Sequence, residues 1–264
     1  DEEWLRLTVP LLEQFYYYWA VPPHLNAATG LSRFYAFGEG AAPEVLFSER
    51  DEEGKSHYDR VKEYYQTFEV ADYDVNLYYD RENDELTNLF YKGDRTMRES
   101  GFDITNRFGP FSADILHYAP VCLNSLLYQM EQDLAQINHV FGNEELEQQW
   151  RNRADIRRDR IDQYLWDEEQ GLYFDYHFQS GERRRYEFAT TFYPLWLGIA
   201  SQAQAQRVME NLSLFEAPGG ILTSTHVTGN QWDAPFGWAP LTLIAVLGLH
   251  RYGYHLEGDR IANK

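Results

Sequence analysis

Two short stretches of this chain combine acidic, aromatic and turn-forming residues at a spacing that suits ligand chemistry. Residues 231–240 read QWDAPFGWAP, which places two tryptophans, one carboxylate, two prolines and one glycine within ten positions. Flat aromatic rings fit the apolar faces of a sugar, a carboxylate accepts hydrogen bonds from sugar hydroxyls, and proline and glycine fix the backbone that presents them. For an arbitrary Trp-Asp pair, however, helix capping or core packing is the more common role.

The second stretch, residues 98–103, reads RESGFD and contains the best candidate for an acid catalyst, Asp103. Gly101 lets the backbone approach a ligand closely, and Phe102 supplies an apolar wall that disfavours the charged form of a nearby carboxyl. Cleavage of a glycosidic bond requires such a protonated carboxyl at the leaving oxygen. In an inverting enzyme a carboxylate stands about 6.5–9.5 Å away, across the attacking water. From residue types alone, a loop aspartate that caps a nearby backbone group is the stronger interpretation.

Both stretches resemble signature motifs of the trehalases, the inverting glycoside hydrolases that split α,α-trehalose into two glucoses. Residues 231–240 are similar to one trehalase signature along their whole length, and residues 99–103 resemble the Glu-Ser-Gly-(aromatic)-Asp motif whose final Asp is the family's general acid. The resemblance therefore implies that Asp103 is the general acid. It also implies a set of candidate substrate-binding residues: Glu44, Arg98, Gly101, Phe102, Arg107, Gln231, Trp232, Asp233 and Trp238.

The assignment of Glu44 rests on an upstream segment. Residues 29–35 (TGLSRFY) and then residues 42–44 (APE) are similar to the segment in which trehalases carry a substrate-binding glutamate. Some trehalases have an arginine just before this Pro-Glu pair, where this chain has Ala42. The resemblance to neutral trehalases implies that Arg98 supplies the positive charge instead. Two further segments resemble the same neutral-trehalase branch: residues 123–128 (LNSLLY) and 187–192 (EFATTF).

The chain also departs from the trehalase pattern. It lacks the N-terminal signature (Pro-Gly-Gly-Arg-Phe with a Trp-Asp pair), the Glu-Lys-(Tyr/Phe)-Asp string that carries the general base, and the Gly-rich lid region. We therefore expect residues 1–264 to be a single trehalase-like catalytic domain truncated at both ends, which holds the acid but not the base. Two alternatives stay open: another toroidal glycosidase that acts on a different α-linked sugar, and a catalytically incomplete carbohydrate-binding fragment.

Composition restricts the partners of this chain. The 264 residues carry a formal net charge of −19, and an acidic surface repels both nucleic acid and anionic membranes, so we expect neither as a partner. No apolar stretch approaches the roughly 20 residues that span a bilayer, and no signal segment is recognisable at the start. The expected partner is a small-molecule disaccharide. The sequence does not indicate which oligomeric state the protein adopts.

We predict neither a metal nor a cofactor. The eight histidines are scattered in the sequence without i,i+4 or cysteine partners, which argues against a zinc site. Residues 72–84 superficially resemble a calcium loop but lack its glycine and its final glutamate. The single cysteine, Cys122, lies in an apolar run, so we predict a buried side chain rather than a reactive thiol. A chain without disulfides is compatible with a reducing compartment, and we expect a cytoplasmic location.

The elements that position these residues are predicted to be mainly helices. Apolar side chains at helical spacing predict helices over Asp1–Trp19, Tyr58–Phe68, Pro120–Gly142, Asn143–Trp166, Thr190–Ala200 and Gln202–Leu212, and a last helix that ends at Tyr252. Pro120 suits the first turn of its helix, and Gly142 suits the position after its end. Arginines and aspartates alternate along Asn143–Trp166, which predicts an exposed outer surface with salt bridges.

The segments between these helices predict loops and one hairpin. Asn26–Gly40 and the charged segment Lys92–Pro110 are expected to be loops, and aromatic residues alternate on either side of Ser180-Gly181, which predicts a β-hairpin. Paired helices joined by loops predict an all-α fold of the (α/α)6 toroid type with one or more small β-hairpins. We expect an incomplete barrel, because roughly seven or eight predicted helices fall short of the twelve in a closed one.

Overall fold

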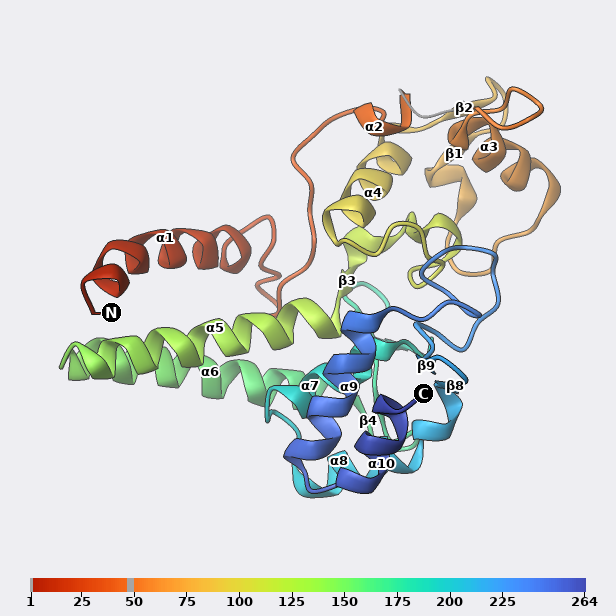
Figure 1. The fold of residues 1–264 in the computed structure, drawn as a ribbon. Coiled ribbons are helices and arrows are strands. Elements are labelled where there is room, and N and C mark those ends of the chain that lie inside the picture. The colour runs from red at the N-terminus through yellow and green to blue at the C-terminus, as the bar shows by residue number, and fades with distance from the viewer. Residues whose placement is uncertain (1, 47–49) are drawn as a thin grey trace.

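The computed structural model describes residues 2–46 and 50–264 of the chain. Its regular structure is mainly helical, as the sequence predicts, with short strands between the helices (Figure 1). The α-helices are α1 (Glu2–Ala20), α2 (Pro43–Leu46), α3 (His57–Thr67), α4 (Asn88–Glu99), α5 (Val121–Val140), α6 (Glu144–Leu165), α7 (Tyr193–Trp196), α8 (Gln202–Glu210), α9 (Ala239–Arg251) and α10 (His255–Ala262). The 3-10 helices are η1 (Val75–Leu77), η2 (Pro110–Ser112), η3 (Ile115–His117), η4 (Ala189–Phe192) and η5 (Leu212–Leu214). The strands are β1 (Tyr79–Asp80), β2 (Glu85–Leu86), β3 (Tyr118–Ala119), β4 (Trp166–Asp167), β5 (Leu172–Tyr173), β6 (Asp175–His177), β7 (Arg183–Arg184), β8 (Glu216–Ala217) and β9 (Gly220–Ile221).

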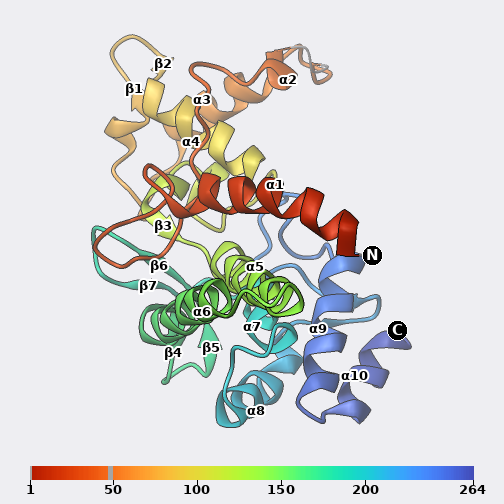
Figure 2. The ribbon, with the colours of Figure 1, turned by 90° about the vertical axis from the view of Figure 1, so that its left-hand side faces the viewer.

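Helices α5 and α6 lie side by side along the middle of the molecule (Figures 1 and 2). Pro120 stands immediately before α5, where its fixed φ suits the first turn. Gly142 follows α5 with φ +72°, a conformation that favours glycine, and this turn sends the chain back into α6. The two long predicted helices are therefore confirmed. The predicted helices over Asp1–Trp19 and Tyr58–Phe68 correspond to α1 and α3, although Asp1 itself lies outside the described residues.

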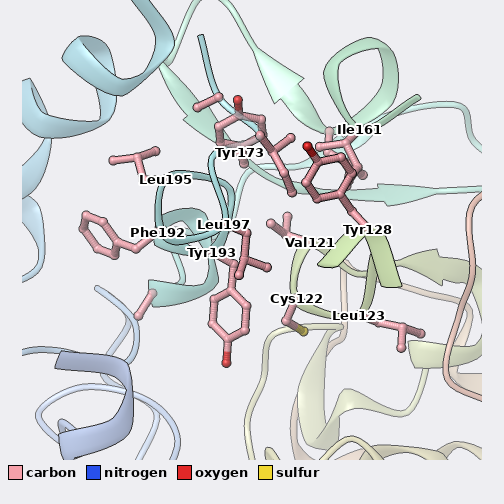
Figure 3. Close-up of a cluster of buried hydrophobic side chains, with 14 of the residues drawn as sticks. Val121, Cys122, Leu123, Tyr128, Ile161, Tyr173, Phe192, Tyr193, Leu195 and Leu197 are labelled. Carbon is pink, nitrogen blue, oxygen red and sulfur yellow. The ribbon is translucent and has the colours of Figure 1, made fainter. Parts of the chain in front are cut away.

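The main hydrophobic core lies where the start of α5 meets α6, β5 and the η4–α7 segment (Figure 3). Val121 and Cys122 contribute to it from α5, Ile161 from α6, and Phe192 and Leu195 from η4 and α7, and all of them are buried. Cys122 is therefore a buried side chain, as predicted, and burial raises the pKa of its thiol. The core thus holds together the segments that precede and follow the hairpin.

A buried polar cluster joins α1 to the α5–α6 pair. Tyr16 of α1 donates a hydrogen bond to Glu131 of α5 over 2.6 Å, and Arg157 of α6 donates to the same carboxylate over 2.9 Å. The prediction of an exposed outer surface on α6 is therefore wrong for Arg157, which points inward, whereas Arg153 is exposed. The inward position is tolerated because Glu131 supplies the opposite charge and a hydrogen bond.

A second hydrophobic cluster forms between α3, α4 and the β1–β2 pair. The prediction of a charged loop over Lys92–Pro110 is wrong for its first half, because the chain is helical in α4 as far as Glu99. Phe90, Asp94 and Met97 lie buried along one face of α4 at helical spacing. The charged residues obscured this face in the sequence, since Asp94 is of a type that usually lies in loops or on surfaces.

The predicted hairpin is confirmed, because β6 and β7 pair antiparallel and β3 lies on the other side of β6. Asp175 stands opposite Arg184 in this pair, and Gly181 turns between the strands with φ +73°. The remaining strands form three two-stranded pairs, β1–β2, β4–β5 and β8–β9. The predicted helix over Thr190–Ala200 is shorter than expected, since a 3-10 turn precedes α7, and α10 was not expected.

The described helices do not close into a ring (Figures 1 and 2), which agrees with the expected incomplete toroid. Helices α1 and α9 instead expose apolar side chains: Trp4, Leu7, Leu11, Phe15, Leu243 and Leu247. Within residues 2–46 and 50–264, no helix is both long and apolar enough to cross a bilayer.

Candidate active site

The structure brings the two predicted stretches into direct contact. The side-chain amide of Gln231 donates a hydrogen bond to the backbone carbonyl of Asp103. The backbone N–H of Trp232 donates to the backbone carbonyl of Ile104 over 3.2 Å. The Asp103 residue is half-buried, and none of the described residues forms a hydrogen bond or ion pair with its carboxyl group. Asp103 therefore does not cap a local backbone group, and its carboxyl group is open to a ligand.

Aromatic rings form a wall beside Asp103. The rings of Trp232 and Trp238 are stacked, with centroids 4.5 Å apart and planes inclined by 17°. Phe102 meets Trp232 edge-on at 5.1 Å, and it meets Phe188 in the same way at 5.4 Å. The indole N–H of Trp238 donates to the backbone carbonyl of Gln231 over 2.9 Å, which fixes the orientation of the pair. Stacked, partly exposed rings of this kind suit the apolar face of a sugar.

Asp233 is placed differently from the sequence expectation. We expected it in the sugar-contacting wall, but it is fully buried beneath that wall. Its carboxylate accepts five hydrogen bonds of 2.7–2.9 Å, and the donors are the hydroxyls of Thr105, Tyr186, Ser224 and Thr228 and the backbone N–H of Asn106. In this position Asp233 ties residues 105–106, which follow Asp103, to the tryptophan loop. We therefore assign it a supporting role in place of sugar binding.

Arg107 also lies away from any surface. It is fully buried and makes two hydrogen bonds of 2.6 Å to the Asp175 carboxylate. Its guanidinium lies 5.5 Å from the centre of the Phe102 ring and 4.6 Å from that of Phe188. Burial by itself lowers the pKa of Arg107, but the Asp175 charge outweighs it and raises the pKa above its ordinary value. Arg107 thus supports the aromatic wall from beneath, in place of the expected sugar contact.

Glu44 and Arg98 form a second group. Glu44 lies on α2, Arg98 lies in the last turn of α4, and 3.7 Å separates Arg98 Nε from Glu44 Oε1. Gly101, three residues further on, is exposed with φ +78°, and a Cβ added there would meet no atom within 4 Å. No hydrogen bond or ion pair among the described residues joins this group to Asp103, so only the backbone from 98 to 103 connects them.

Sequence reasoning missed the residues that support the site. Asp94 pairs with Arg98 at 3.2 Å, and it could have been found from its i,i+4 spacing had α4 been recognised as a helix. Asp175 lies 68 positions from Arg107, and no local pattern indicates such a partner. The hydroxyl donors around Asp233 are likewise spread over the chain. None of these donors lies within residues 98–103 or 231–240, the two stretches that the sequence singled out.

Among the residues that the structure describes, one group of side chains lies close enough to hold a metal ion, so the histidines are not all scattered in space. Asp114, His117 and His177 offer ligand atoms within 4.8 Å of one another. The His177 Nδ1 accepts the Ser180 N–H at 2.9 Å, so its proton lies on Nε2 and faces the Asp114 carboxylate at 3.2 Å. His117 Nδ1 lies 2.5 Å from that carboxylate. In this structure the three side chains are joined by hydrogen bonds.

A polar cavity lies beside this group, because His177 is one of the residues that line it. It has a volume of about 750 Å³, and Asn106, Arg184, Tyr186 and His226 are among the residues that line it. Tyr186 and His226 stack with centroids 3.9 Å apart. Asp103 is not among the residues that line this cavity.

Comparisons with known proteins identify the family of this chain. The trehalase family model matches residues 1–264. The cytosolic neutral trehalase of Kluyveromyces lactis is 35% identical to this chain, over 95% of this chain and 35% of that protein. The solved structure of a neutral trehalase from Saccharomyces cerevisiae matches with a TM-score of 0.76 and 34% identity, over 95% of this chain and 48% of that one.

A more distant match indicates the fold alone. The GH63 mannosylglycerate hydrolase from Thermus thermophilus has a TM-score of 0.50 and 18% identity, over 64% of this chain and 43% of that chain. The match to the yeast enzyme supports the predicted toroidal fold class. The chain spans about a third of the length of the curated relatives that it matches. On the family model and these identities, the chain belongs to the trehalase family.

Proposed function

We propose that the protein containing this chain hydrolyses α,α-trehalose to two glucoses with inversion, and that Asp103 is the general acid. The observation that carries this proposal is the contact between the Asp103 segment and the tryptophan loop, which leaves the carboxyl group open beside an aromatic wall. A protonated carboxyl in this position can deliver its proton to the leaving glycosidic oxygen. We assign the general base to no residue of this chain.

We assign sugar contacts to those candidate residues whose side chain or backbone is at least partly exposed. We assign them to Glu44, Arg98, Gly101, Phe102, Gln231, Trp232 and Trp238. Carboxylate and guanidinium groups hydrogen-bond sugar hydroxyls, and the rings pack against the sugar face. Asp233 and Arg107 act beneath these residues, because both are fully buried. Residues 1–264 then form part of one catalytic domain.

The expected location and partners agree with the names of the relatives. The curated relatives from Kluyveromyces lactis and Saccharomyces cerevisiae are named cytosolic neutral trehalases, and we propose a cytosolic location here too. The net charge of −19 disfavours nucleic acid as a partner, so we propose a disaccharide substrate alone.

The test is Asp103→Asn in the full-length protein, because asparagine keeps the shape of the side chain but cannot donate an acid proton. We expect hydrolysis of trehalose to be lost while calorimetry still detects trehalose binding. Asp155→Asn, which alters a half-exposed carboxylate on α6, serves as the control and should leave both unchanged. Turnover by the Asp103→Asn variant at the normal rate would contradict the proposal.

The alternative is a glycosidase for a different α-linked sugar. The mannosylglycerate hydrolase from Thermus thermophilus shares the fold alone. Parallel assays of several α-linked disaccharides separate the two functions. A third possibility is carbohydrate binding without turnover, for which calorimetry would detect trehalose binding although no glucose forms.

A further inference from the structure

A series of hydrogen bonds runs behind the two candidate sugar-binding residues Glu44 and Arg98. The Asp94 carboxylate accepts two bonds from the Arg98 guanidinium, each 3.2 Å long. The Tyr58 hydroxyl donates to the same carboxylate over 2.9 Å and accepts the backbone N–H of Ala42, also at 2.9 Å. Ala42 stands two residues before Glu44, which itself lies 3.7 Å from Arg98. These contacts connect α2, α3 and α4 in one circuit.

The inner members of this circuit are buried, and the outer members reach the surface. Asp94 is 1% exposed, whereas the side chains of Arg98 and Glu44 are 16% and 59% exposed. Burial by itself raises the pKa of Asp94, but His57 and Arg98 outweigh it and hold the pKa below its ordinary value. The His57 Nε2 lies 3.7 Å from the Asp94 carboxylate. Asp94 is therefore a fixed anion behind a partly exposed cation.

Such an arrangement restricts the groups that would meet a ligand. A free arginine side chain samples many rotamers, and holding one of them on binding costs entropy. The two bonds to Asp94 fix the guanidinium plane in advance. The Tyr58 hydroxyl fixes both Asp94 and the backbone that leads into α2, so it sets the position of Arg98 relative to Glu44.

We propose that Asp94 and Tyr58 are positioning residues for sugar binding. They hold Arg98 and Glu44 at the separation that the sugar requires, without touching the sugar themselves. This inference rests on the proposed trehalase function, and it extends that function to two buried residues that no sequence motif contains. A merely structural role would instead lower stability and leave substrate affinity unchanged.

The chain offers a matched control for this distinction. Tyr78 is also buried, belongs to the same hydrophobic cluster as Tyr58, and donates a hydrogen bond of 2.6 Å to a buried aspartate, Asp114. Tyr58→Phe and Tyr78→Phe each remove a buried Tyr–Asp hydrogen bond, and Tyr58→Phe also removes the acceptor of the Ala42 N–H. Only Tyr58→Phe disturbs the residues behind Arg98.

The experiment measures kcat and KM for trehalose, together with Tm, in the full-length protein. We expect Tyr58→Phe to raise KM about tenfold, the effect of losing one hydrogen bond to a charged group, with kcat changed by less than about twofold. Tyr78→Phe should lower Tm and leave KM unchanged. Asp94→Asn, which removes the anion that holds Arg98, should raise KM further than Tyr58→Phe.

Two failures can be told apart. If the unmodified full-length protein releases no glucose from trehalose, the proposed function is wrong. If it does release glucose, and Tyr58→Phe lowers Tm but leaves KM at the unmodified value, the positioning role alone is overturned. Tyr58→Phe tests the positioning role even if Asp94→Asn does not fold, because loss of a single hydroxyl leaves the packing of the ring intact.

Discussion

Asp233 and Asp94 are both buried carboxylates beside the candidate site, but different groups compensate their charges. Asp233 accepts five hydrogen bonds from four hydroxyls and one backbone N–H, and no cation among the described residues touches it. Asp94 accepts bonds from a tyrosine and from Arg98, whose guanidinium also reaches the surface. The first arrangement fixes backbone, and the second fixes a side chain that a ligand can meet.

This difference separates two ways of building one site. The Asp233 hydrogen bonds join loops that are far apart in sequence, so they determine whether the acid and the aromatic wall meet at all. The Asp94 contacts act within α2–α4 and adjust only the sugar-binding pair. Loss of Asp233 should therefore disturb folding and catalysis together, whereas loss of Asp94 should affect affinity first.

The largest effect is expected for Asp233→Ala. It leaves five donors without an acceptor in a buried site, and each buried unsatisfied group is costly, so we expect a loss of about 4 kcal/mol in the free energy of unfolding. Chemical denaturation of the full-length protein measures this loss, with Asp155→Ala on the surface as the control. A change below about 1 kcal/mol would show that Asp233 does not hold the two loops together.

The buried ion pair between Arg107 and Asp175 is also expected to stabilise the fold beneath the site. Arg107→Met leaves a buried carboxylate without its cation, for which we expect a loss of about 3 kcal/mol in unfolding free energy. The double variant Arg107→Met, Asp175→Asn removes both charges and should lose less than the sum of the two single variants, by at least about 1 kcal/mol. Denaturation of all three variants completes the cycle, and strictly additive losses would argue against a coupled pair.

The smallest effect is expected for Asp114→Asn, which should change how Tm depends on pH. Burial raises the pKa of Asp114, but its contacts with His117, His177 and Tyr78 outweigh burial and lower the pKa to about 2. A carboxyl whose pKa is lower in the folded state stabilises the fold above its unfolded pKa, and this contribution disappears as pH falls through the folded value. We expect Asp114→Asn to flatten the fall of Tm between about pH 4 and pH 2. Equal slopes for the variant and the unmodified protein would contradict this.

Sequence patterns predicted the parts of the molecule that local rules determine. Pro120 and Gly142 mark the ends of α5. The alternating aromatic residues around Ser180-Gly181 indicated where the hairpin lies. Helix α4 was missed because its buried face includes the charged Asp94, which hydrophobic periodicity does not count.

The candidate site was predictable only where its residues form local motifs. The two motifs are local, and the structure brings them into contact. Arg107 is buried against Asp175, 68 positions away, and the donors to Asp233 lie between 5 and 128 positions from it, all outside residues 231–240. No pattern within either motif could distinguish these supporting residues from sugar-binding ones.

The most direct test of the central claim compares two substrates in the Asp103→Asn variant of the full-length protein. Glucose leaving from trehalose needs a proton from a general acid, whereas fluoride leaving from α-D-glucosyl fluoride does not. We predict that the variant loses about a thousandfold in rate on trehalose but less than about tenfold on the fluoride. Equal losses on both substrates would contradict the role of Asp103 as the proton donor.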